Sequence, residues 1–156
     1  MATRQRAAFS GGDKLAAKLK EISERVSKGT FVRVGFLEDA TYPDGQPVAQ
    51  VAAHLNYGTS KMPPRPFFRQ FIAQNKDGWG KKLGNVLAAA GYDTTLALGR
   101  MGYGMKGQLQ ETIIAFNNPP DSKETLARKK SKFGEDSTLI DTAHMLNSVD
   151  FDVKGD

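Results

Sequence analysis

Residues 51–71 read Val-Ala-Ala-His-Leu-Asn-Tyr-Gly-Thr-Ser-Lys-Met-Pro-Pro-Arg-Pro-Phe-Phe-Arg-Gln-Phe. An apolar helical run reaches Tyr57 and Gly58, where glycine can adopt the left-handed conformation that ends a helix. The prolines within 63–66 then keep the chain extended, because each fixes its own φ and disfavours the α conformation in the preceding residue. The stretch therefore predicts a rigid elbow between two helices, which positions a surface and carries no catalytic apparatus.

Three phenylalanines follow the prolines at helical spacing, with arginines between them. Such a mixture can stack on single-stranded nucleic acid. Phe67, Phe68 and Phe71 fit one side of a helix, however, which favours packing in the core or between subunits. The residues predicted to set the shape of the elbow or to form an interface are Tyr57, Gly58, Thr59, Pro64, Arg65, Pro66, Phe67, Phe68 and Arg69.

The elements on either side of the elbow are predicted from apolar periodicity and from the positions of glycine and proline. Leu15, Leu19, Ile22 and Val26 recur three or four positions apart, which predicts a helix that starts at Asp13. Residues 1–12 have no such pattern and predict a flexible N-terminal arm. The other predicted elements are a strand at 31–37, helices at 47–57, 67–74, 79–100, 107–117 and 122–132, and a helical turn at 139–148 that enters a final strand.

Size and composition fit one domain, residues 13–156, with a real core, since 39% of the 156 residues are hydrophobic. The chain carries a net charge of +5 and contains no cysteine. Lysine and arginine dominate residues 1–30, whereas acidic residues dominate 135–156, so these ends can pair within a chain or between subunits. The lack of disulfides and of a bilayer-spanning apolar run predicts a soluble intracellular product without a membrane partner.

The residue types that carry out catalysis are present without the spacing that catalysis needs. His54 and His144 are the only histidines and form no metal-ligand pair. Ser148 lies near His144 but lacks the Gly-x-Ser-x-Gly elbow of a hydrolase nucleophile. We therefore predict no catalytic residue, no metal site and no cofactor, and interpret both histidines as structural or interface residues.

Residues 99–107, Gly-Arg-Met-Gly-Tyr-Gly-Met-Lys-Gly, are glycine-rich and include a lysine. They lack the Gly-x-x-x-x-Gly-Lys-Ser/Thr pattern, and no predicted strand precedes them. We interpret the segment as a flexible break between two helices; a loop that contacts phosphate is the alternative. The glycines at 84, 91 and 99 suggest close packing against another backbone, or a kink.

The densest basic cluster falls in the predicted helix 122–132 and comprises Arg128, Lys129, Lys130 and Lys132. One interpretation is a solvated helix face, which needs no partner. The other is contact with the DNA backbone, which would be strongly salt-sensitive because lysines neutralise phosphates without reading bases.

Three segments occur in a fixed order: Val32-Arg-Val-Gly-Phe36, then residues 51–69, then Leu139-Ile-Asp-Thr-Ala-His-Met-Leu-Asn-Ser-Val149. This order resembles the tail-completion and neck proteins of long-tailed bacteriophages, also called head–tail joining, virion morphogenesis or minor tail proteins. Their signature is an apolar helix ending in aromatic-Gly-Thr, a Pro-x-Arg-Pro-Phe segment and a late Leu-x-Asp-Thr-Gly-x-Leu-x-x-Ser. The match covers roughly residues 30–153. Ala143 departs from it, because the family usually has glycine there.

The resemblance implies an α+β subunit without enzymatic activity, in which a small antiparallel sheet packs against several helices. It implies a homo-oligomeric ring in the virion neck or tail that docks to connector or adaptor subunits and to tail-tube or tail-terminator subunits. Assembly would take place in the cytoplasm of the bacterial host, with possible contact to DNA in the channel. The alternative function is a small DNA-binding module that acts through the helix at 122–132.

Overall fold

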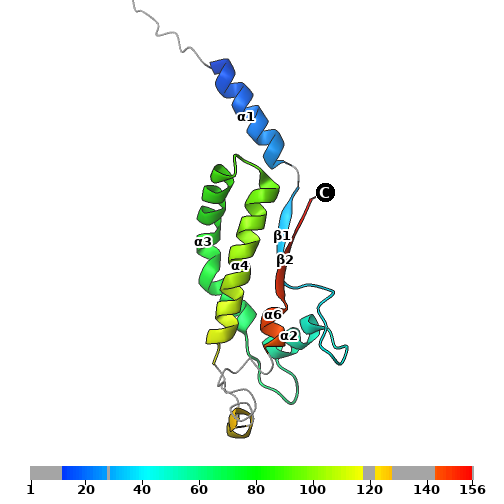
Figure 1. Cartoon of the computed structure of the whole chain (residues 1–156). Coiled ribbons are helices and arrows are strands. Elements are labelled where there is room, and N and C mark those ends of the chain that lie inside the picture. Colours follow the sequence, from blue (N-terminus) through cyan, green and yellow to red (C-terminus); the bar gives the residue numbers. More distant parts are fainter. Residues whose placement is uncertain (1–11, 28, 118–121, 128–142, 156) are drawn as a thin grey trace, which may run out of the picture.

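The computed structural model describes residues 12–27, 29–117, 122–127 and 143–155, and Figure 1 shows their arrangement. The elements are α1 Gly12–Val26, β1 Phe31–Phe36, α2 Val48–Tyr57, α3 Phe67–Ala89, α4 Thr94–Ala115, α6 His144–Asn147 and β2 Val149–Lys154. A short helical segment at 123–127 lies between α4 and α6 in the chain. The predicted α+β class, with a small antiparallel sheet packed against helices, is confirmed.

The sheet joins segments that are far apart in the sequence. β1 pairs antiparallel with β2, from Phe31 opposite Lys154 to Phe36 opposite Val149. One face packs against α4. On the other face, the Arg33 guanidinium donates to both carboxylate oxygens of Asp152, at 3.0 and 2.7 Å. This hydrogen bond lowers the pKa of Asp152 below its usual value, so the ion pair stabilises the two strands at neutral pH and is lost when acid protonates the carboxylate.

Two long helices, α3 and α4, form an antiparallel hairpin, and their ends differ from the predicted ones. The helices predicted at 67–74 and 79–100 do not end there: α3 runs without a break to Ala89. The chain turns at residues 90–93, where Gly91 and Tyr92 both have positive φ, 60° and 63°. Asp93 then caps α4, because its side chain accepts a hydrogen bond from the Leu96 amide at 3.0 Å.

The glycine-rich segment 99–107 is helical and lies inside α4, so its interpretation as a flexible break is wrong. Packing outweighs the low helix propensity of glycine here, because Ala97, Met101 and Leu109 of the same helix are buried. The predicted close packing at Gly84, Gly91 and Gly99 is also wrong, because a Cβ at any of the three would meet nothing within 4 Å. Gly91 instead lies in the turn between α3 and α4, where the chain changes direction.

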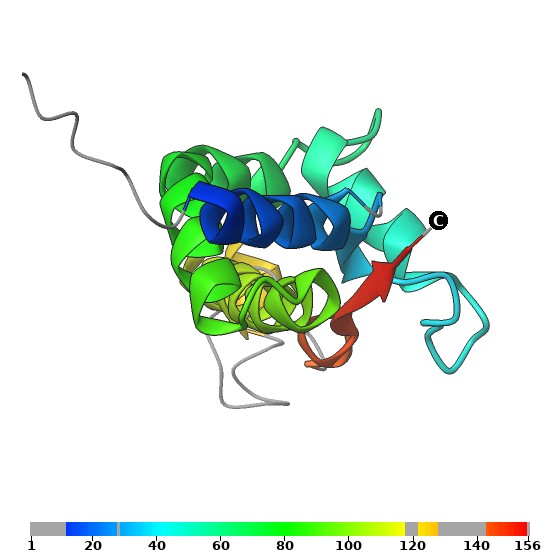
Figure 2. The same ribbon diagram turned by 90° about the horizontal axis from the view of Figure 1, so that it is seen from above.

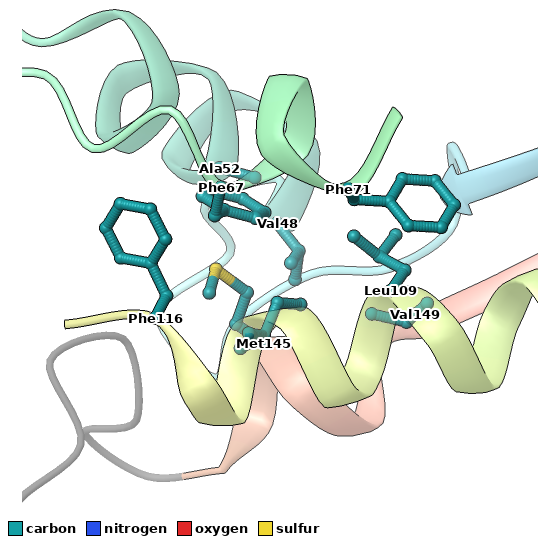
Figure 3. Close-up of a cluster of buried hydrophobic side chains, with 9 residues drawn as sticks. Val48, Ala52, Phe67, Phe71, Leu109, Phe116, Met145 and Val149 are labelled. Carbon is teal, nitrogen blue, oxygen red and sulfur yellow. The ribbon is translucent and has the colours of Figure 1, made fainter. Parts of the chain in front are cut away.

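The core lies where α2, α3, α4, α6 and β2 meet (Figure 3). Its members are Val48, Ala52, Phe67, Phe71, Leu109, Ile113, Phe116, Met145 and Val149. Phe67 contacts Phe36, Phe68 and Phe116 edge-on, with ring centroids 6.3–6.5 Å apart. The first turn of α3 therefore holds the elbow in place. Of the three phenylalanines predicted to pack in the core or between subunits, Phe67 and Phe71 are buried in the core and Phe68 is partly buried against it.

Helix α1 is the one described long helix that adds nothing to this core. Its residues are all at least partly exposed. It lies beyond the end of the α3–α4 hairpin in Figure 1 and crosses over that end in the view from above in Figure 2. None of the helices in the described parts of the chain is both long and apolar enough to cross a membrane.

Ala143, the residue that departs from the family pattern, precedes α6 with φ 57° and ψ 1°. This is the left-handed region, which costs an L-residue roughly 1–2 kcal/mol and glycine almost nothing. Glycine also raises the entropy of the unfolded chain, which offsets part of that gain. The turn before the last strand thus keeps the conformation that glycine would favour, although alanine occupies it.

We expect Ala143→Gly to stabilise the protein by up to about 1 kcal/mol, because it removes the strain of a left-handed alanine. Thermal unfolding followed by circular dichroism measures this as a rise in Tm. Ala73→Gly, at an exposed position inside α3, is the matched control and should lower stability by about 1 kcal/mol. A loss of stability in both variants would show that residue 143 is not held in the left-handed conformation.

Candidate docking interface

The elbow begins at Gly58, where α2 ends. The Gly58 amide donates to the carbonyl oxygen of His54 at 2.8 Å, with φ at 77°. A Cβ at this position would lie 2.8 Å from the backbone nitrogen of Pro64 and 2.9 Å from the carbonyl oxygen of Met62. Only glycine satisfies both the positive φ and this close approach of the returning chain.

The tip of the elbow is a tight turn made by residues 59–62. The Thr59 amide donates to the Met62 carbonyl at 2.9 Å, and the Met62 amide donates back to Thr59 at 3.3 Å. The Thr59 hydroxyl also accepts from the Lys61 amide at 3.3 Å. These bonds hold a short projection whose residues Thr59, Ser60 and Lys61 are exposed.

Residues 63–66, the segment of the elbow that returns toward α2, are held to that helix by one backbone hydrogen bond. The Arg65 amide donates to the carbonyl oxygen of Leu55 at 2.7 Å. The Arg65 side chain is half-buried, and its Nε lies fully inside the protein. Pro66 then precedes α3, and its carbonyl oxygen accepts the first helical hydrogen bond, from Gln70 at 2.9 Å.

Asn56 completes the junction between α2 and α3, a role that the sequence analysis missed. Its side chain is 4% exposed, and Oδ1 accepts from the Phe68 amide at 3.3 Å. Pro66 has no side-chain acceptor with which to cap α3, so Asn56 of another helix satisfies an amide of its first turn. The available signal was a polar residue within an apolar helical run, because a buried amide side chain requires partners.

The nine predicted elbow residues divide between an inner and an outer face. Phe67 is fully buried, whereas Tyr57 is 69% exposed. The Arg69 guanidinium lies 5.1 Å from the centre of the Tyr57 ring, and its Nη2 donates to the Asn56 carbonyl at 3.4 Å. The outer face therefore presents an ordered aromatic–cation pair beside the tip at 59–62.

The other predicted functional residues do not join this surface. His144 interacts with a different loop: its Nε2 lies 2.8 Å from the carbonyl oxygen of Thr41, and its ring packs against Tyr42. His54 is exposed on α2. Within the described ranges, the acidic and histidine side chains form no cluster of three or more that could hold a metal ion. The basic cluster of Arg128, Lys129, Lys130 and Lys132 lies outside the described residues.

Comparisons with protein-family models, with curated proteins and with solved structures found no match to this chain.

Proposed function

We propose that this chain is a non-enzymatic structural subunit of a long-tailed bacteriophage virion. It completes the junction between neck and tail by forming a ring, and it docks to connector subunits on one side and to tail-tube or tail-terminator subunits on the other. In this proposal the elbow, residues 57–69, is the docking element.

The observation that carries the proposal is that the elbow is held rigidly while its outer face stays exposed. Gly58, the backbone bond from Arg65 to Leu55 and the buried Phe67 fix its shape from inside. A preorganised surface loses little conformational entropy on docking, which raises affinity without additional contacts. Tyrosine and arginine, which form the outer pair, are the side chains that most often dominate binding energy at protein interfaces.

The geometry at Ala143 supports the resemblance from an independent segment. Family members usually have glycine at this position, and here the alanine has a left-handed backbone with φ 57°. A glycine at this position would favour the same left-handed backbone before the last strand. Two separate segments of the resemblance, the elbow and this turn, thus have the backbone geometry that their motifs require.

The test measures the mass of the purified protein by light scattering across a concentration series, alone and with connector or tail-tube subunits. We expect the 17.0 kDa chain to grow into a discrete ring, alone or with a partner. The double substitution Tyr57→Ala, Arg69→Ala should leave Tm nearly unchanged and weaken this assembly at least tenfold, as loss of an interface hot spot does. Gln74→Ala, an exposed change further along α3, is the control and should assemble normally.

Two results would overturn the proposal. In the first, the elbow variant assembles as well as the unaltered protein. In the second, the protein remains a monomer with every partner and binds DNA with an affinity that falls steeply as salt rises. Salt-dependent DNA binding lost on replacing Arg128, Lys129 and Lys130 would assign the chain to the DNA-binding alternative.

A further inference from the structure

Helix α1 carries an apolar stripe that the other described residues leave largely uncovered. Leu15 is 62% exposed, Leu19 57% and Val26 44%, and Ile22 of the same stripe is half-buried. Four aliphatic side chains on one side of one helix are more than the scattered apolar residues of an ordinary surface. A stripe of this kind is typical of a helix that packs against a partner.

The attachment of α1 holds it apart from the core that the other described helices form. The Arg25 guanidinium donates to the carbonyl oxygen of Gly91 at 3.0 Å, which holds the C-terminal end of α1 at the α3–α4 turn. From there α1 extends away from the body of the molecule (Figure 1). The groove between α3 and α4 is lined by residues of these two helices alone, among them Lys82 and Arg100, so α1 does not occupy it.

The spacing of the stripe is that of a coiled-coil seam. Steps of four, three and four residues place Leu15 and Ile22 at d positions and Leu19 and Val26 at a positions of a heptad. Lys18 and Arg25 then fall at g positions, and the small residues Ala16 and Ser23 fall at e positions. On the helix surface, Lys18 and Arg25 both form ion pairs with Glu21, at 2.9 Å each.

The residues beside the seam favour one direction for a pair of α1 helices. In an antiparallel pair of α1 helices, g positions face g positions, so Lys18 would oppose Arg25 across the interface. In a parallel pair, g positions face e positions, and each cation meets a small uncharged side chain instead. The repulsion present in one arrangement and absent in the other favours parallel pairing.

We propose that the α1 seam, Leu15, Leu19, Ile22 and Val26, packs against the same seam of a second copy of this chain in a parallel coiled coil. A membrane surface fits α1 less well, because its stripe is narrow and has no aromatic residue, and because its polar face includes Asp13, Glu21 and Glu24. The inference does not depend on the proposed virion role. A contact between the same seam of two copies is isologous, so the two copies are related by a twofold axis.

Two heptads bury less surface than a stable dimer requires, which is roughly 800 Å² on each partner. The pairing is therefore weak when it acts alone, and it adds to other contacts by raising the effective concentration of the attached bodies. The experiment must consequently detect a transient parallel contact. Covalent trapping does so, and the chain suits it because it contains no cysteine.

The test compares single-cysteine variants under mild oxidation. Leu19→Cys places a thiol at an a position and should give a disulfide-linked dimer as the main product. Ala17→Cys, two residues away on the opposite side of α1, is the matched control and should cross-link at least tenfold more slowly. Adding Leu15→Glu to Leu19→Cys should slow cross-linking by a similar factor and leave Tm unchanged, because the core does not include α1.

Several outcomes would contradict the proposal. Equal cross-linking of Leu19→Cys and Ala17→Cys would show random collision. A mixture of Leu15→Cys and Val26→Cys that forms mainly the mixed dimer would show antiparallel pairing. Binding to phosphatidylserine vesicles without any cross-link would assign the face to membranes. The elbow variant Tyr57→Ala, Arg69→Ala, combined with Leu19→Cys, should cross-link as fast as Leu19→Cys alone, so failure of α1 pairing and failure of elbow docking can be told apart.

Discussion

Replacing Phe67 with alanine is expected to lower the free energy of unfolding by about 3–5 kcal/mol. Phe67 is fully buried and contacts three other phenylalanines edge-on, so the substitution removes apolar burial and leaves a cavity among rings contributed by β1, α3 and the segment after α4. Each favourable aromatic pair adds to the loss beyond its buried area. Because small domains are stable by only about 5–15 kcal/mol, this single change removes a large share of the total.

Chemical denaturation followed by circular dichroism measures the effect as a fall in the midpoint concentration of urea. Ile72→Ala is the matched control, because Ile72 lies on the same helix and is 38% exposed; it should cost less than about 1 kcal/mol. Phe67→Leu should retain part of the lost stability. Similar losses at positions 67 and 72 would mean that the elbow is not anchored through Phe67.

The fold class and the order of the elements were predictable, but the boundaries between the long helices were not. Apolar periodicity gave α1, β1, α2 and the closing strand to within a few residues. The predicted helices left a gap at 75–78, and the glycine-rich segment 99–107 was interpreted as a break. Both segments are helical, since packing against neighbouring elements outweighs propensity. The turn between α3 and α4 depends on positive φ at Gly91 and Tyr92. Gly91 was singled out in the sequence, but a tyrosine gives no sign of a left-handed backbone.

The elbow was predictable as a unit because glycine and proline impose its backbone directly. Its division into faces was not, since Phe67 and Arg69 follow the same proline run and only the tertiary fold separates them. Asn56 illustrates the same limit: its hydrogen bond to the Phe68 amide spans twelve positions, and no local rule pairs them. The exposure of the apolar face of α1 was equally unpredictable. An amphipathic pattern predicts that one face is buried, but it does not say whether the same chain or another molecule buries it.

Gly102 is the position at which a larger side chain is expected to do the most harm within α4. A Cβ there would overlap the ring of Phe151 and lie 2.9 Å from Cγ2 of Val32. Both strands of the sheet approach α4 at this point, and Gly102 itself is buried. We expect Gly102→Leu to destabilise the protein by about 3 kcal/mol or more, because the side chain separates the sheet from the helix that covers it.

Gly104 provides the matched control two residues away, since a Cβ there meets nothing within 4 Å. Gly104→Leu should raise stability by up to about 1 kcal/mol, because it replaces glycine with a good helix former at an open position. The stability of Gly102→Ala should lie between those of Gly102→Leu and Gly104→Leu. Its single methyl group raises helix propensity but still collides with Phe151. If thermal unfolding shows that Gly102→Leu lowers stability and Gly104→Leu raises it, the effect at position 102 comes from close packing and not from helix propensity. A stabilising Gly102→Leu would mean that the sheet does not contact α4 at this glycine, and the packing of sheet on helix would have to be revised.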